Sequence, residues 1–110
     1  MHIPNQFAKQ LKSLCLLAKN AKTGFEKAAI FSATELFVKN FLERNAYNEW
    51  VNHRIQGIKF HINAALGYES ANGYHPDSHA NWALSEIDEL LSYSRDYCHQ
   101  IFVKHEGDEG

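Results

Sequence analysis

Arg95 and His99 are the two residues whose types and spacing come closest to a catalytic pair. His99 follows Arg95 by four positions on a stretch with helical periodicity, so both side chains are expected on one helical face. An arginine that stabilises a phosphate, beside a histidine that transfers a proton, is a minimal arrangement for cleaving RNA without a metal. The alternative interpretation is a polar pair on a helix surface.

His75 and His79 form a second candidate site at the start of the same helix. Two histidines four residues apart can share a metal ion. Pro76 is expected in the first helical turn, which places His75 outside the helix, so two solvated loop histidines are the alternative. Any further ligand would come from the nearest remaining candidates, namely His53, His61, Glu69 or Asp77.

Other arrangements that carry chemistry are not found in the sequence. Cys98 and His99 are adjacent, and neighbouring residues on a helix point in different directions, so they cannot act as a nucleophile and its base. His53 and His61 lack the spaced carboxylates of a di-iron site and are interpreted as ordinary helix histidines. There is no glycine-rich phosphate loop, serine elbow or zinc-type cysteine cluster. We therefore expect no cofactor.

The apolar periodicity predicts an all-α fold, a four-helix bundle that forms a single domain over residues 1–110. Most predicted connections are short, so neighbouring helices are expected to be mostly antiparallel. The predicted helix 25–44 is apolar nearly all round, which indicates a central helix or an interface, and we expect the central position. The four helices are predicted over residues 5–22, 25–44, 46–66 and 77–104.

Three glycines mark special positions in these helices. Gly24 is expected in a left-handed cap between the first two helices, and Gly67 is expected to end the third. Gly57 lies inside the third helix, where glycine costs about 1 kcal/mol relative to alanine. Its presence indicates either close helix packing or simple tolerance.

One long loop, residues 67–76, separates the third and fourth helices. Its glycines, asparagine, serine and proline exclude regular structure. Since helix connections usually have about two to eight residues, this loop is the expected place for a partner or ligand contact. Tyr68 and Tyr74 flank the loop and Trp82 follows it, and these three residues are the predicted partner contacts.

Composition limits the classes of partner. The 11 basic and 13 acidic residues give a net charge of −2, so no overall attraction to nucleic acid or an anionic membrane is expected. The first helix is nonetheless locally basic, and its lysine face is either solvated or contacts an acidic partner or a phosphate backbone. Its lysines are Lys9, Lys12, Lys19 and Lys22.

The sequence also carries signals about location. No apolar run approaches 18 residues, so neither a membrane-spanning helix nor a membrane partner is expected. The N-terminus lacks the charged region and continuous apolar stretch of a signal peptide. Cys15 and Cys98 fall on apolar helix faces, as expected for reduced core residues of a cytoplasmic protein. The acidic, glycine-rich tail 105–110 is expected to be disordered.

Two stretches resemble the HEPN family of small helical nucleases and nucleotide-binding helpers. FEKAAIFSATELFVKNFLE, residues 25–43, resembles the second helix of that family, and RDYCH, residues 95–99, resembles its Arg–spacer–His motif. The spacer of three residues is shorter than the family usually has, and the two stretches cover about a quarter of the chain. The resemblance implies a four-helix bundle that often dimerises and sometimes cleaves RNA.

Two functions follow from these observations. The first is a non-catalytic interaction or accessory subunit, because no catalytic constellation is complete and a chain of 110 residues cannot bury all these aromatic residues alone. We then expect a homo-oligomer, most simply a two-fold dimer, or a protein partner on the same surface. The second is a HEPN-like metal-independent ribonuclease that uses Arg95 and His99, with RNA as its partner.

Overall fold

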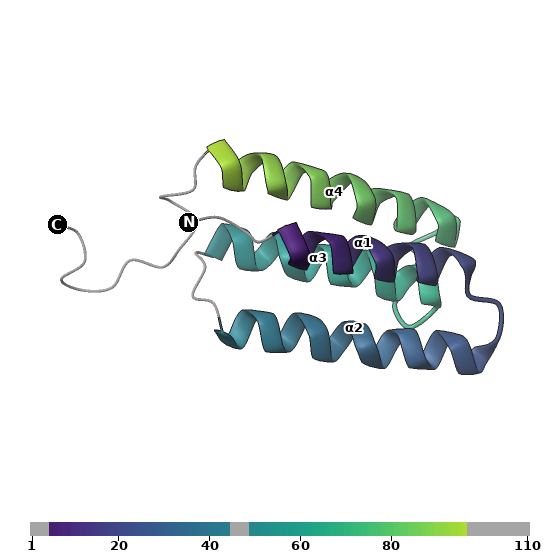
Figure 1. The fold of residues 1–110 in the computed structure, drawn as a ribbon. Helices are drawn as coiled ribbons and strands as arrows, with labels where there is room; N and C mark the ends of the chain where they lie inside the picture. The colour runs from purple at the N-terminus through teal and green to yellow at the C-terminus, as the bar shows by residue number, and fades with distance from the viewer. Residues whose placement is uncertain (1–4, 45–48, 97–110) are drawn as a thin grey trace, which may run out of the picture.

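A computed structural model describes residues 5–44 and 49–96 of the chain. Over these ranges the protein is all-α and contains no strand. Its helices lie side by side along one axis, and each runs antiparallel to the helix before it (Figure 1). The prediction of an all-α four-helix bundle is therefore confirmed. The helices are α1 (Asn5–Asn20), α2 (Gly24–Arg44), α3 (Glu49–Leu66) and α4 (Pro76–Asp96).

The predicted boundaries agree closely with these elements. The long loop between α3 and α4 is confirmed, and it covers residues 67–75 because Pro76 already belongs to α4. The predicted fourth helix, 77–104, is described as far as Asp96, and its remainder lies outside the described residues, as does the tail 105–110. None of the helices in the described ranges is long and apolar enough to cross a membrane.

A capping box formed by Thr23 and Glu26 starts α2. The Glu26 backbone N–H donates to Thr23 Oγ1 at 3.1 Å, and the Thr23 backbone N–H donates to Glu26 Oε1 at 3.1 Å. These bonds satisfy donors that an uncapped helix start leaves free, and the Thr23 N–H that donates to the Glu26 carboxylate lowers the pKa of Glu26. Gly24 is not among the left-handed glycines, so the cap predicted there is wrong. The cap at this turn is instead the side chain of Thr23, which precedes α2.

Gly67 ends α3, as predicted. Its φ of 91° lies in the left-handed region, which glycine adopts without a Cβ penalty. The Gly67 N–H donates to the Ala64 carbonyl at 3.1 Å, and the Tyr68 N–H donates to the Asn63 carbonyl at 2.8 Å. This pair of bonds is a Schellman motif, and it directs the chain into loop 67–75.

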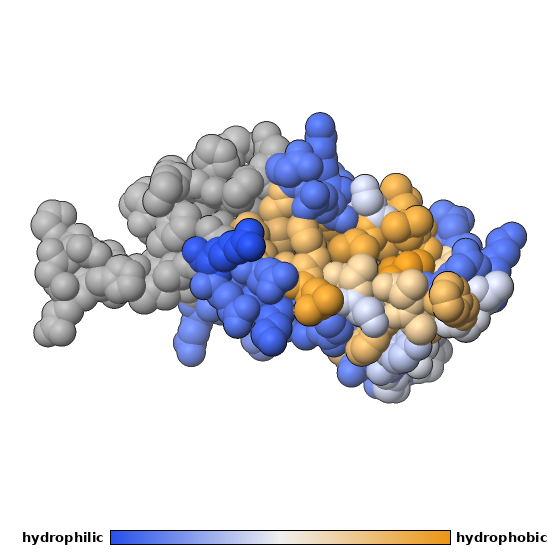
Figure 2. Space-filling model, turned by 60° about the horizontal axis from the view of Figure 1, so that its bottom comes forward, coloured by the Kyte–Doolittle hydropathy of each residue, from blue (hydrophilic) through white to orange (hydrophobic). Residues whose placement is uncertain are grey.

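The position of α2 differs from the prediction. α2 packs on α1 and α3 and, over its described length, does not reach α4. Thr34 and Val38 are its only buried residues, whereas α3 buries eight and contacts all three other helices. The expectation of a central second helix is therefore wrong, and α3 holds the central place. The apolar residues on the outside of α2 contribute to the exposed apolar surface in Figure 2.

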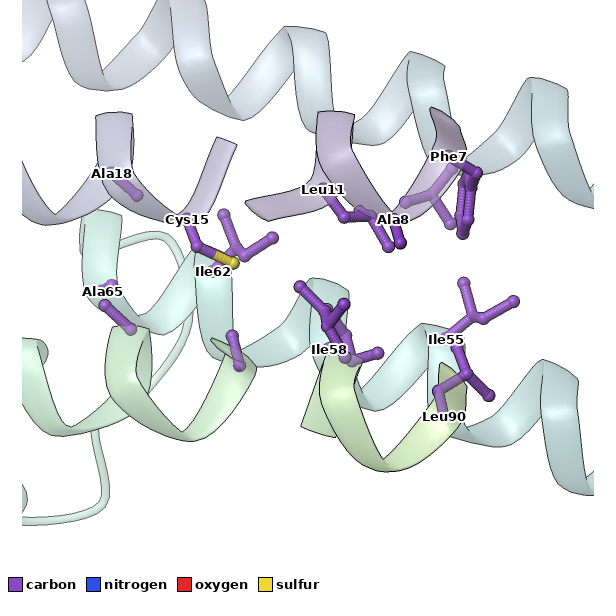
Figure 3. Packing of buried hydrophobic residues seen from close by; sticks show 14 of the residues in the cluster. Phe7, Ala8, Leu11, Cys15, Ala18, Ile55, Ile58, Ile62, Ala65 and Leu90 are labelled. Carbon is purple, nitrogen blue, oxygen red and sulfur yellow. The ribbon is translucent and has the colours of Figure 1, made fainter. Parts of the chain in front are cut away.

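The core is built mainly from α1, α3 and α4. One side of α1 points toward α3 and α4, and the labelled side chains meet there (Figure 3). Cys15 is fully buried in this layer, and burial raises the pKa of its thiol to about 12, so the thiol stays protonated. Cys98 lies outside the described residues. The buried α1 and α3 members of this core include Phe7, Leu11, Cys15, Ala18, Ile55, Ile58 and Ile62.

Candidate functional site

The structure gives no geometry for the predicted catalytic pair. Arg95 lies in the last turn of α4, but its side chain is outside the described part of the structure. His99 lies wholly outside the described residues. The ribonuclease interpretation therefore stays a prediction.

The predicted metal pair, His75 and His79, has its members in different environments. His75 is exposed, and its Nδ1 accepts a hydrogen bond from the Asp77 backbone N–H at 3.1 Å. His79 is only 2% exposed and points into the bundle, where both of its ring nitrogens have partners. No group of three His, Cys, Asp or Glu residues within 5–44 and 49–96 could hold a metal ion.

His79 belongs instead to a partly buried polar chain that links the long loop to α3 and α4. His79 Nε2 lies 2.9 Å from the Ala71 carbonyl oxygen in loop 67–75. His79 Nδ1 lies 3.0 Å from Nδ1 of His61 on α3. His61 Nε2 in turn lies 2.8 Å from Glu86 Oε2 on α4, an ionic contact that is not well aligned as a hydrogen bond. We call Ala71, His79, His61 and Glu86 the histidine relay.

Charged residues surround the Glu86 end of the relay. Arg54 contacts Glu86 Oε1 at 3.3 Å and Glu89 Oε2 at 3.4 Å, so the guanidinium neutralises this end. Burial lowers the pKa of His61. The Glu86 carboxylate acts in the opposite direction and raises this pKa, whereas a positive charge on His79 lowers it further. An open pocket of about 360 Å³ adjoins this end, lined by His53, Arg54, Gln56, Gly57, Phe60 and Glu86.

The predicted partner contacts Tyr68, Tyr74 and Trp82 are all exposed, in two separate aromatic groups. Tyr74 meets Trp82 edge to face with ring centroids 5.0 Å apart, and Trp82 also packs edge-on against His79 at 5.1 Å. Tyr68 instead stacks on Phe31 of α2 at 4.2 Å. The loop is thus attached to α2 at its beginning and to the histidine relay near its middle. A partner for any of the three remains a prediction.

A larger apolar surface lies on the side of the molecule that carries α1 and α2 (Figure 2). Phe25 is 85% exposed at the start of α2, and Leu36 is 59% exposed about three turns later. Leu16 and Leu17, near the end of α1, are also at least half exposed. Exposed large apolar side chains gathered in one region are typical of interaction sites, whereas scattered ones are not.

Two lysines on the basic side of α1 are partly used within the protein. Lys12 pairs with Asp88 of α4 at 2.7 Å, and Lys19 donates to Asn81 Oδ1 at 3.2 Å. The contacts are exposed and stabilise the α1–α4 contact only slightly. Because of these contacts, Lys12 and Lys19 are less available to bind a phosphate backbone.

Sequence reasoning missed the histidine relay. It treated His61 as an ordinary helix histidine and mentioned it only as a possible further ligand for His79. The two histidines are 18 positions apart, and Glu86 is 25 positions beyond His61, so no local spacing connects them. One feature of the sequence could have indicated the relay. Ala80, Ala83 and Ile87 define the buried side of α4, and helical geometry then places His79 and Glu86 beside that side.

Comparison of the chain with protein-family models, with curated proteins and with solved structures finds no match.

Proposed function

We propose that this protein is a helical interaction module that works by surface contact and associates with a second copy of itself through the outward face of α2. The exposure of Phe25 and Leu36 on one face of that helix is the observation that carries the proposal. Burying one such side chain contributes about 2 kcal/mol, so a surface that covers both gains appreciable free energy.

The arrangement of side chains on this face supports a second copy as the partner. The face is large at both ends and small between them, and its pattern is symmetric about the midpoint between residues 30 and 31. If two α2 helices pack antiparallel about that point, Phe25 of one copy comes opposite Leu36 of the other, and Ala29 comes opposite Ser32. The exposed residues of the face are Phe25, Ala28, Ala29, Ser32, Ala33 and Leu36.

Shape and charge both favour this pairing. Small residues in the middle let two helix axes approach to about 8 Å, at the close end of the usual range. None of the six residues is charged, so two identical faces bury no unpaired charge. A two-fold contact also closes on itself and does not propagate into a fibre.

Sedimentation velocity over a range of protein concentrations tests the proposal. The wild-type protein, 12.6 kDa as a monomer, is expected to sediment increasingly as a dimer as its concentration rises. Phe25→Glu and Leu36→Glu each replace a large apolar side chain of the contact with a charge, and each is expected to shift the protein to monomer. Tyr74→Glu is the matched control, because it puts the same charge at an exposed aromatic position away from α2.

A wild-type protein that stays monomeric at every concentration would contradict self-association. A dimer that persists in both α2 variants but is lost in Tyr74→Glu would instead place the contact at the aromatic group of the long loop.

A metal-independent ribonuclease is the second proposal. It is supported by the resemblance of residues 25–43 and 95–99 to the HEPN family and by the helical position of Arg95 near the end of α4. Its test is the cleavage assay described in the Discussion.

A further inference from the structure

The histidine relay joins three structural parts through three short contacts. The Ala71 carbonyl in the loop meets His79 at 2.9 Å, His79 meets His61 at 3.0 Å, and His61 meets Glu86 at 2.8 Å. The first two contacts are hydrogen bonds, which need a proton between their atoms, and the third brings His61 Nε2 so close to a carboxylate oxygen that Nε2 must carry a proton. Without that proton, two lone pairs would face each other in a half-buried site.

The three contacts therefore need three protons. The Ala71 carbonyl can only accept, so His79 Nε2 must carry the first. The second lies between the two Nδ1 atoms, and the third lies between His61 Nε2 and Glu86. Two neutral histidines and a carboxylate hold only two protons in total. The complete relay thus holds one proton more than its members carry in their ordinary states at neutral pH.

The surrounding charges decide which contact is lost when the extra proton leaves. Arg54 holds the Glu86 carboxylate, and Glu89 lies on the other side of Arg54. A carboxylate is the strongest acceptor in the relay, so His61 keeps its proton on Nε2 and must accept from His79 at Nδ1. Neutral His79 then presents a lone pair to the Ala71 carbonyl. That contact is the one to open, because the loop around it is largely exposed and water can satisfy its carbonyl.

We propose that the histidine relay is a proton-dependent latch, which holds loop 67–75 against α4 when it carries three protons and releases the loop at Ala71 when it carries two. The latch does not depend on self-association through α2. Its release changes the packing of Tyr74 and Trp82, which lie against His79 with centroid distances of 6.3 and 5.1 Å. The latch thus makes the exposed aromatic group sensitive to pH.

The other titratable groups nearby are few. His53 lines the pocket beside Glu86, and His75 and Asp77 lie at the end of the loop, all on exposed positions. Since burial lowers the pKa of His61, the third proton is expected to enter below the ordinary histidine range. The latch is then closed in mildly acidic solution and open at neutral pH and above.

Imidazole nitrogen NMR of the wild-type protein tests the latch, at about pH 5 and about pH 8, on either side of the ordinary histidine pKa. His79 is expected to carry its proton on Nε2 at the lower pH and to change to the Nδ1–H tautomer at the higher pH. The Ala71 carbonyl carbon signal is expected to shift over the same pH range. A His79 that keeps Nε2–H throughout, with an unchanged Ala71 signal, would overturn the proposal.

Glu86→Gln sharpens the test, because the glutamine amide brings its own proton. Its N–H₂ can donate to His61 Nε2, so two neutral histidines complete the relay without an extra proton, and the amide oxygen can still accept from Arg54. The latch in this variant is expected to stay closed at both pH values. His75→Ala, which removes an exposed histidine outside the relay, is expected to switch like the wild type. A Glu86→Gln protein that switches with pH like the wild type would contradict the proton count.

Discussion

His61 and His79 face each other through like atoms, with their Nδ1 nitrogens 3.0 Å apart. One nitrogen must donate and the other accept, so the tautomer of each ring depends on that of its neighbour. The Ala71 carbonyl and the Glu86 carboxylate fix the outer ends of the pair. This relationship makes the tautomers of the ring pair depend on the number of protons that the pair binds.

The stability of the fold should depend on pH through His61. Burial holds its pKa below the value of about 6.5 that a histidine has in an unfolded chain. Between these two pKa values the unfolded chain binds more protons than the folded protein, so the free energy of unfolding falls as the pH falls through that window. Urea unfolding at about pH 7.5 and about pH 5.5 measures the loss. Between these two pH values, the free energy of unfolding is expected to fall less in His61→Gln than in the wild type.

The matched control for this measurement is His53→Gln, an exposed position on the same helix. It is expected to lose as much stability on acidification as the wild type does. Equal losses in all three proteins would show that His61 does not couple folding to pH.

Gly57→Ala should stabilise the protein. A Cβ at this position would meet only Glu86 Oε1, at an ordinary contact distance of 3.9 Å, so the helix has room for it. Alanine favours a helix interior over glycine by about 1 kcal/mol, and the free energy of unfolding should rise by about that amount. Chemical denaturation measures the change. A loss of stability would mean that α3 and α4 approach more closely there than the structure shows.

The ribonuclease proposal makes its own prediction. If Arg95 stabilises the scissile phosphate and His99 transfers a proton, single-stranded RNA should be cleaved by the purified protein in the presence of a chelator. Arg95→Ala and His99→Ala should each abolish cleavage while the circular dichroism spectrum stays helical. If the wild type and both variants show the same background cleavage, the ribonuclease proposal fails and the interaction module is unaffected.

The sequence predicted the helices well because each one carries a local pattern. Ile55, Ile58 and Ile62 follow helical spacing and are all fully buried, and Gly67 ends α3 with the left-handed conformation that glycine favours. The position of α2 was predicted wrongly, because an apolar surface all round a helix is expected both for a central helix and for one that contacts a partner. Only the packing in three dimensions separates these two cases.

The histidine relay could not be predicted from spacing. Its members come from a loop and two helices, and the backbone carbonyl of Ala71 has no signature in the sequence at all. The pattern at His75 and His79 pointed to His79 and named His61 only as one of four possible further metal ligands. His79 meets His61 because the helix that begins at Pro76 turns His79 toward α3.

Disulfide trapping across α2 tests the central claim that a second copy covers this face. Two proteins, each with Cys98→Ser, would carry Ala29→Cys and Ser32→Cys respectively and be mixed under mild oxidation. Cys15 can remain, because its buried thiol has a pKa of about 12 and does not react. Ala29→Cys mixed with Tyr74→Cys is the control pair. We predict that the 29–32 mixture forms the mixed disulfide dimer several-fold more efficiently than the 29–74 mixture, and equal yields from the two mixtures would contradict the account.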